Sequence, residues 1–132
     1  MKTTQATKFR AMVKQYGLVS DDFWKASQGF VIITRTGIEK VQRCLGIQVT
    51  YEVVAELSDV SSGLYVIKAT GVNKDKLVES YGEAGPKNCR NAYPVAMAEK
   101  RALSRVVLKM ADMYEMGVYG EDEGEFTKTR QQ

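Results

Sequence analysis

The chain has 132 residues, of which 44% are hydrophobic and 27% are charged, and its formal net charge is +3. This length and composition are typical of one soluble domain with its own core. Because no apolar run approaches the roughly 20 residues that cross a bilayer, and the N-terminus lacks the apolar segment of a signal peptide, we expect a cytoplasmic protein without membrane contact. Cys44 and Cys89 are the only cysteines, and both are expected to be reduced.

The first third of the chain predicts two helices around a short strand. Apolar residues recur at helical spacing over 7–16, and a loop follows over 18–29. The apolar run 30–34 indicates a short buried strand. Thr36 and Glu39 then match a capping box, which predicts the start of a small helix.

The central part of the chain predicts a sheet. Apolar and polar residues alternate over 48–57, 64–72 and 77–83, and the turns between these segments are short enough to make the strands antiparallel neighbours. A polar linker over 82–91 leads into the longest predicted helix, 93–112, which carries an apolar stripe. The predicted fold class is α+β: an antiparallel β-meander with a long C-terminal helix packed across one face, and small helices before the meander.

Charge is unevenly distributed along the sequence. Five of the 16 acidic residues lie over 115–125, where hydrophobic residues are sparse. We therefore predict a single domain over 1–117 and a flexible acidic tail over 118–132. A basic body with an acidic tail is common in proteins that handle nucleic acid, although an ordinary solvated surface with a polar tail explains the same charges.

The long helix carries a basic ladder. Arg101, Arg105 and Lys109 follow one another at intervals of four residues, and Lys100 stands beside them. Like charges at this spacing repel by about 0.2–0.5 kcal/mol per pair, yet almost no acidic residue stands three or four positions away. The sequence therefore predicts that another part of the fold, or a ligand, neutralises this ladder.

The usual groups of catalysis and metal binding are missing from the sequence. There is no histidine, the two cysteines lack zinc-type spacing, and no glycine-rich phosphate loop is present. Four glutamates could gather on a sheet face and bind a divalent cation, as nucleases require, although solvent-facing strand positions explain them equally well: Glu52, Glu56, Glu79 and Glu83. We expect no catalytic residue, no metal, no cofactor and no small-molecule substrate.

The residues Lys100-Arg101-Ala102-Leu103, followed closely by Arg105, come after a strand, a small helix and a three-stranded meander. This arrangement, over roughly residues 28–116, resembles the Rad-fifty-two-like superfamily of single-strand DNA-annealing proteins, which includes phage recombination proteins. The resemblance implies that Lys100 and Arg101 hold the phosphates of single-stranded DNA and that Arg35 supplies a further cation. In the family the next arginine directly follows the leucine, whereas here Ser104 intervenes. Homo-oligomeric rings or filaments formed through the sheets, without a nucleotide cofactor, are also implied.

These observations lead to one functional expectation. The protein is expected to bind and anneal single-stranded DNA in homologous recombination, as an oligomeric ring or filament without ATP, in the host cytoplasm if it is encoded by a phage. It would not be an enzyme. Contact with phosphates alone leaves the bases free to pair. The predicted nucleic-acid-binding residues are Lys100, Arg101, Arg105, Arg35, Lys87, Arg90 and Arg43.

Three other interpretations remain open. A double-stranded-RNA-binding module also has a helix, three strands and a helix that begins with lysines, but here the segment 30–34 and the helix after it are additional. In a structural oligomer subunit, acids of a neighbour would pair with the basic ladder, and the chain's own residues 121–125 could instead occupy the groove as an internal mimic of DNA. A metal-dependent nuclease is the third.

Four aromatic residues could stack on bases, although large aromatics usually pack in the core: Trp24, Tyr65, Tyr81 and Tyr93.

Overall fold

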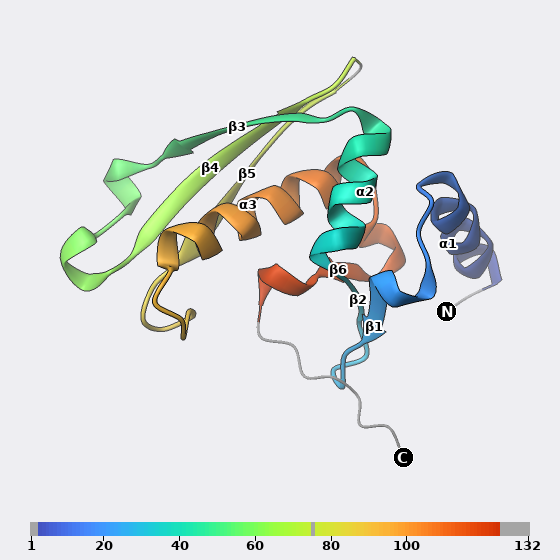
Figure 1. The fold of residues 1–132 in the computed structure, drawn as a ribbon, viewed down its shortest axis with the longest axis horizontal. Coiled ribbons are helices and arrows are strands. Elements are labelled where there is room, and N and C mark those ends of the chain that lie inside the picture. Colours follow the sequence, from blue (N-terminus) through green and yellow to red (C-terminus); the bar gives the residue numbers. More distant parts are fainter. Residues whose placement is uncertain (1–2, 75, 125–132) are drawn as a thin grey trace.

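The computed structural model describes residues 3–74 and 76–124. Within these ranges the chain forms three α-helices and six strands, which are arranged in two sheets (Figure 1). The helices are α1 (Thr3–Gln15), α2 (Arg35–Leu45) and α3 (Pro94–Met110). The strands are β1 (Phe23–Lys25), β2 (Val31–Ile33), β3 (Gln48–Val53), β4 (Tyr65–Val72), β5 (Leu77–Ala84) and β6 (Val118–Gly120).

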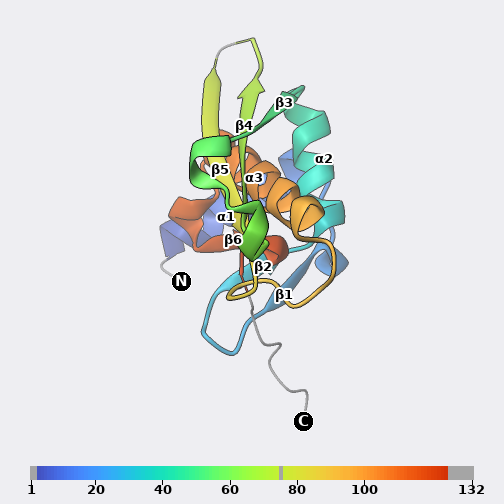
Figure 2. The same cartoon turned by 90° about the vertical axis from the view of Figure 1, so that its left-hand side faces the viewer.

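The larger sheet is the predicted meander. Its strands are antiparallel in the order β3-β4-β5, and α3 crosses one face of it, which confirms the α+β fold class. The alternation along β4 explains the packing, because Ile67, Ala69 and Gly71 are buried on the side of α3, whereas Lys68 and Thr70 on the other side are partly exposed. The β4–β5 hairpin projects beyond the helices (Figure 2).

The helix α3 approaches β5 with almost no side chain between them. A Cβ atom on Gly82 would lie 2.1 Å from the carbonyl oxygen of Ala98 and 2.5 Å from the amide nitrogen of Ala102. Both distances are far shorter than any van der Waals contact. A glycine on the strand is therefore what allows the backbones of β5 and α3 to meet.

A second, smaller sheet joins the two ends of the described chain. β1 is antiparallel to β2, and β6 lies parallel to β2 with Val31 opposite Val118. The acidic tail predicted over 118–132 consequently does not begin at residue 118. Val118 is fully buried in the core, so its hydrophobic burial holds this segment in the fold despite the acidic residues that follow. Residues 125–132 of the predicted tail lie outside the described residues.

The start of α2 differs from the predicted capping box. The helix begins at Arg35, and its N-cap is Thr34, whose Oγ1 accepts a hydrogen bond of 3.1 Å from the amide of Gly37. Thr34 takes this role because β2 ends directly before it, so the chain has already turned into the helix at Thr36. The cap places Arg35 in the first turn of α2.

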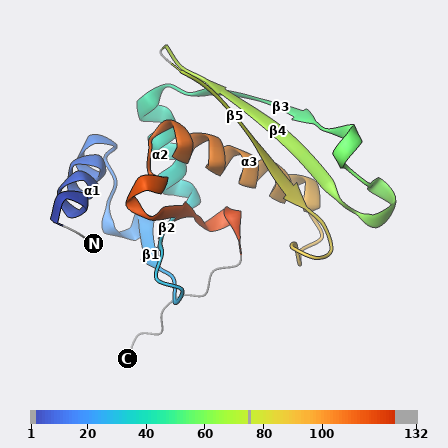
Figure 3. The same ribbon diagram turned by 180° about the vertical axis from the view of Figure 1, so that it is seen from behind.

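The main core lies where α1, α2 and α3 meet the sheets. Its central side chains are fully buried: Ile33, Ile38, Val41, Val106, Leu108 and Met113. Among the described residues, no helix combines the length and the apolar character that a membrane crossing requires. Seen from behind, the segment after α3 turns back beneath this helix and runs alongside it through β6 (Figure 3). That return brings the acidic residues after β6 to the basic side of α3.

Candidate nucleic-acid interface

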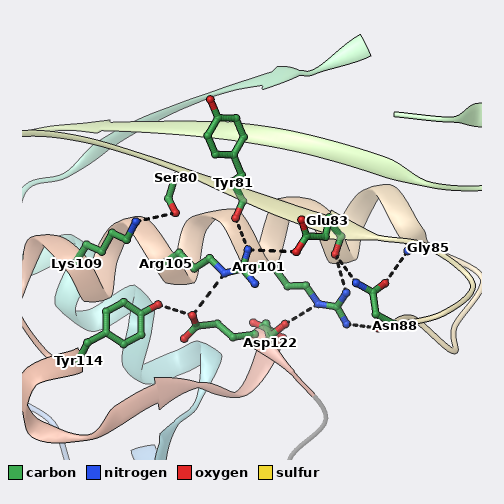
Figure 4. Close-up of polar contacts among 11 residues, drawn as sticks. Ser80, Tyr81, Glu83, Gly85, Asn88, Arg101, Arg105, Lys109, Tyr114 and Asp122 are labelled. Carbon is green, nitrogen blue, oxygen red and sulfur yellow. Dashed lines mark hydrogen bonds and ion pairs between the residues drawn. The ribbon is translucent and has the colours of Figure 1, made fainter. Parts of the chain in front are cut away.

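Arg101 is the anchor of the polar network beside α3 (Figure 4). Only 5% of this residue is exposed. Its guanidinium donates three hydrogen bonds to main-chain carbonyl oxygens, at 2.8 Å to Glu83, 2.6 Å to Asn88 and 2.9 Å to Asp122. Arg101 thereby fastens the end of β5, the linker before α3 and the C-terminal segment to one another.

The other two members of the basic ladder, Arg105 and Lys109, also have partners within the described residues. Arg105 donates to the carbonyl oxygen of Tyr81 at 2.5 Å, and its guanidinium lies 3.9 Å from a carboxylate oxygen of Glu83 and 3.7 Å from one of Glu123. The ammonium group of Lys109 donates to Ser80 Oγ at 3.3 Å. Counter-charge reaches this ladder at Arg105, from Glu83 and Glu123, whereas Arg101 and Lys109 donate to uncharged oxygen atoms.

The two arginines also cover one edge of the larger sheet. Tyr81 and Glu83 pair with Lys68 and Val66 of β4, and their carbonyl oxygens receive the arginine hydrogen bonds on the outer edge of β5. An edge strand normally offers such groups to another chain. The arginines of α3 block this for the C-terminal half of β5.

The residues Glu121–Glu123 form a single 3-10 turn after β6, which we name the acidic turn. Glu121 Oε1 accepts a hydrogen bond of 2.8 Å from the backbone amide of Arg35, and its Oε2 accepts one of 3.4 Å from Trp24 Nε1. Glu123 accepts from the backbone amide of Gly120 at 2.6 Å and from the hydroxyl of Tyr114. A carboxylate against the first turn of α2 is favoured by the free N–H groups and the helix dipole there.

Asp122 lies at the point where three cations converge. Its Oδ2 is 3.9 Å from Arg35 Nη1, and the charges of Arg35, Lys100 and Arg101 all lower its pKa. Burial has the larger effect, however, and the pKa of Asp122 is raised above its usual value. Asp122 Oδ2 and Arg35 Nη1 are both buried without a hydrogen-bond partner, so this ion pair is incompletely compensated for its loss of water.

Glu123 is in a similar position. Burial raises its pKa, and the hydrogen bonds from Tyr114 and Gly120 together with the charge of Arg105 only partly offset this effect. The desolvation of the two carboxylates therefore opposes the docking of the acidic turn at neutral pH.

Acid is accordingly expected to stabilise the docked turn. Because the pKa of Glu123 is raised in the folded chain, its contribution to stability is fully present below about pH 4, the range of a free carboxyl group, and is lost as the pH rises through the raised value. Glu123→Gln does not titrate. The unfolding temperature of the wild type should therefore rise relative to that of the variant as the pH falls from about 8 to about 4, the range of a free carboxyl group. Parallel curves would contradict this assignment.

The structure distributes the seven predicted binding residues over two places. Lys87, Arg101 and Arg105 line a pocket of about 310 Å³ between α3 and the linker, and Arg35 and Lys100 lie around Asp122 next to it. Arg90 is exposed on the linker. Arg43 is not part of this group, because it lies in the last turn of α2 and lines a different pocket, with Gln42 and Gly46.

Four residues that matter for this network are not among the predicted binding residues: Tyr114, Glu121, Asp122 and Glu123. The sequence predicted a flexible tail for the three acids, with occupation of the groove by residues 121–125 as an alternative. The ladder without counter-charge and the acidic run after the helix are the signals that favour that alternative. Of the aromatics, Trp24 contacts Glu121, whereas Tyr81 and Tyr93 are 44% and 71% exposed, contrary to a role in the core.

The glutamates considered as metal ligands do not form a cluster among the described residues. Glu79 pairs with Lys68 at 2.6 Å, and Glu83 faces Arg105. Within residues 3–74 and 76–124, no three metal-ligating side chains come together.

Comparison with known proteins gave no match: no protein-family model fits the chain, and neither a curated protein nor a solved structure is similar to it. The function is therefore inferred from the residues and their geometry.

Proposed function

We propose that this protein binds the phosphate backbone of single-stranded DNA and anneals complementary strands, as an oligomer and without ATP. The observation that carries the proposal is the convergence of Arg35 from α2 with Lys100 and Arg101 from α3 around the carboxylate of Asp122. These cations come from distant parts of the sequence, and a fold that gathers them around one anion has the electrostatics of a phosphate site.

The exposed cations beside this point are the proposed DNA contacts. Lys100 is exposed on α3, and Lys87 and Arg90 are exposed on the linker that leads into it. Tyr93, which is 71% exposed immediately before α3, could add stacking on a base. Arg101, by contrast, is assigned to hold the linker and the C-terminal segment in place, because its donors are occupied by carbonyl oxygens.

Assembly through the sheet is proposed to use β3. The amide of Val54 donates to the carbonyl oxygen of Val66 at 2.9 Å, so Val49, Tyr51 and Val53 direct their N–H and C=O groups away from β4. Val53 is 59% exposed. The edge of β3 therefore offers main-chain groups to a second copy, whereas the arginines cover part of β5.

The function is tested first by salt-dependent binding to a fluorescent oligothymidylate. Each phosphate contact on a single strand adds about 0.7 to the slope of log affinity against log salt. We expect Lys87→Ala/Lys100→Ala to bind more weakly and to reduce this slope by about 1.4. The matched control is Lys8→Ala/Lys14→Ala, which removes two exposed lysines from α1 at the other end of the molecule and should leave the slope unchanged.

If both double variants show the same salt slope, Lys87 and Lys100 do not contact DNA phosphates.

The annealing step is measured separately, as the rate at which two complementary labelled strands form a duplex with and without the protein. Duplex RNA as a competitor distinguishes a double-stranded-RNA-binding module, which would prefer it. Light scattering on the same samples gives the oligomeric state.

A further inference from the structure

We propose that the acidic turn is a built-in competitor of DNA: in the free protein Glu121–Glu123 occupies the phosphate positions of the interface, and the DNA backbone displaces the turn when it binds. This inference rests on the proposed function and adds a mode of regulation to it. The DNA-binding activity of the protein would then depend on how firmly its own turn is docked.

The contacts of the turn are those that a phosphodiester chain would make. The carboxylate of Glu121 accepts a hydrogen bond from the backbone amide in the first turn of α2, as bound phosphates do. The next, Asp122, faces Arg35 with Lys100 and Arg101 nearby. The third, Glu123, lies 3.7 Å from Arg105 Nε. Three successive carboxylates thus meet the backbone amide of Arg35, the guanidinium of Arg35 and the guanidinium of Arg105.

A buried hydroxyl beneath the turn gives an independent indication. Ser104 is fully buried, and its Oγ has no hydrogen-bond partner. A Cβ atom added at Gly120 would lie only 3.1 Å from this oxygen and 3.2 Å from Glu123 Oε2, so Gly120 packs against Ser104. A buried hydroxyl without a partner is costly. The packing of the segment from Gly120 to Glu123 against α3 therefore leaves a buried polar group unsatisfied, which disfavours the docked state of the turn.

The docking of the turn is also incompletely compensated. Asp122 Oδ2 and Arg35 Nη1 are both buried atoms, and they lie 3.9 Å apart without a hydrogen bond. A DNA phosphate stays ionised, and the neighbouring phosphates of the strand remain in contact with water. Replacing the carboxylate by a phosphate therefore costs less desolvation than docking the turn does. Displacement need not disturb β6, because Val118 is fully buried and pairs with Val31. The moving part is therefore the acidic turn.

Trp24 provides a direct reporter of the docked state. It is the only tryptophan in the chain, and its Nε1 donates to Glu121 Oε2. The expected result is a change of Trp24 emission as DNA is added to the wild type. An abasic oligonucleotide of about 16 units, near the upper end of common site sizes, should cause the same change as oligothymidylate, because phosphates alone displace the turn.

The second arm of the experiment measures affinity in matched charge variants. Asp122→Lys repels the turn from Arg35, Lys100 and Arg101, whereas Glu56→Lys makes the same change of net charge at an exposed residue outside the network. Asp122→Lys is expected to bind oligothymidylate about tenfold more tightly than Glu56→Lys at equal salt, within the usual range of coupling between two sites. Unfolding temperatures establish that both variants are folded.

The outcomes separate this inference from the proposed function. If both variants bind DNA equally well, or if Trp24 emission in the wild type stays constant at saturating abasic oligonucleotide, the turn does not compete and the inference is overturned while DNA binding stands. If neither the wild type nor Asp122→Lys binds at low salt, the proposed function itself fails. If Asp122→Lys does not fold, the inference is tested by the wild type alone: a change of Trp24 emission with the abasic oligonucleotide supports it, and constant emission overturns it.

Discussion

Replacing Gly82 with alanine is expected to lower the free energy of unfolding by about 3 kcal/mol, the upper end of typical overpacking effects. The new methyl group would lie 2.1 Å from the carbonyl oxygen of Ala98 and 2.5 Å from the amide of Ala102. Neither atom can move aside as a flexible side chain would, because both belong to the backbone of α3. The helix must therefore shift away from β5. Thermal unfolding should show a decrease of roughly 10 °C in the midpoint.

The control for this substitution is Gly17→Ala. Gly17 has a φ of +65° and no heavy atom within 4 Å of an added Cβ, so it tests backbone strain without crowding. The expected effect is about 1 kcal/mol. If Gly82→Ala is no more destabilising than this control, the close contact between β5 and α3 is not a determinant of the fold.

Replacing Arg101 with alanine should destabilise the protein by about 3 kcal/mol, because three hydrogen bonds from one buried guanidinium are lost at once. Its neighbour Lys100 is exposed, and Lys100→Ala should change stability by no more than about 0.5 kcal/mol. The effects on DNA affinity are expected in the opposite order: at a temperature at which every variant is folded, Lys100→Ala should weaken DNA binding more than Arg101→Ala. Denaturant unfolding and oligonucleotide binding on the same samples give both quantities.

Arg101→Lys sharpens the comparison. It keeps the positive charge, but a single ammonium group cannot reproduce the planar arrangement of donors that reaches three carbonyl groups. We expect it to be destabilised and to retain DNA binding while folded. If Arg101→Lys instead matches the wild type in stability and binds DNA poorly, Arg101 contacts phosphate and its role here is misassigned.

The larger sheet and α3 could be predicted from the sequence because each is long enough to show its own period. Of the second sheet, only β2 could be predicted, from the apolar run over 30–34. The strands β1 and β6 have three residues each, too few for a pattern, and β6 pairs with β2 from a distant part of the chain. The start of α2 was predicted wrongly at Thr36, since Thr34 and Thr36 are both suitable caps and only the end of β2 decides between them.

The candidate site was predicted in part. The basic ladder and its missing counter-charge are visible in the sequence, and Arg35 does lie near Lys100 and Arg101. What the sequence could not reveal is that main-chain carbonyl groups satisfy Arg101. Every residue carries a carbonyl group, so these acceptors leave no sequence signature. Only the fold determines which of them are turned toward a guanidinium.

The pairing of β2 with β6 has a consequence during synthesis. The ribosome completes Val31–Ile33 long before it reaches Val118–Gly120, so in the nascent chain the edge of β2 waits without its partner while the helices and the meander are made. Such a long-range contact forms late, and an apolar strand with a free edge invites association with other chains in the meantime. Folding is therefore complete only when β6 pairs with β2. Until then the chain is most prone to aggregate.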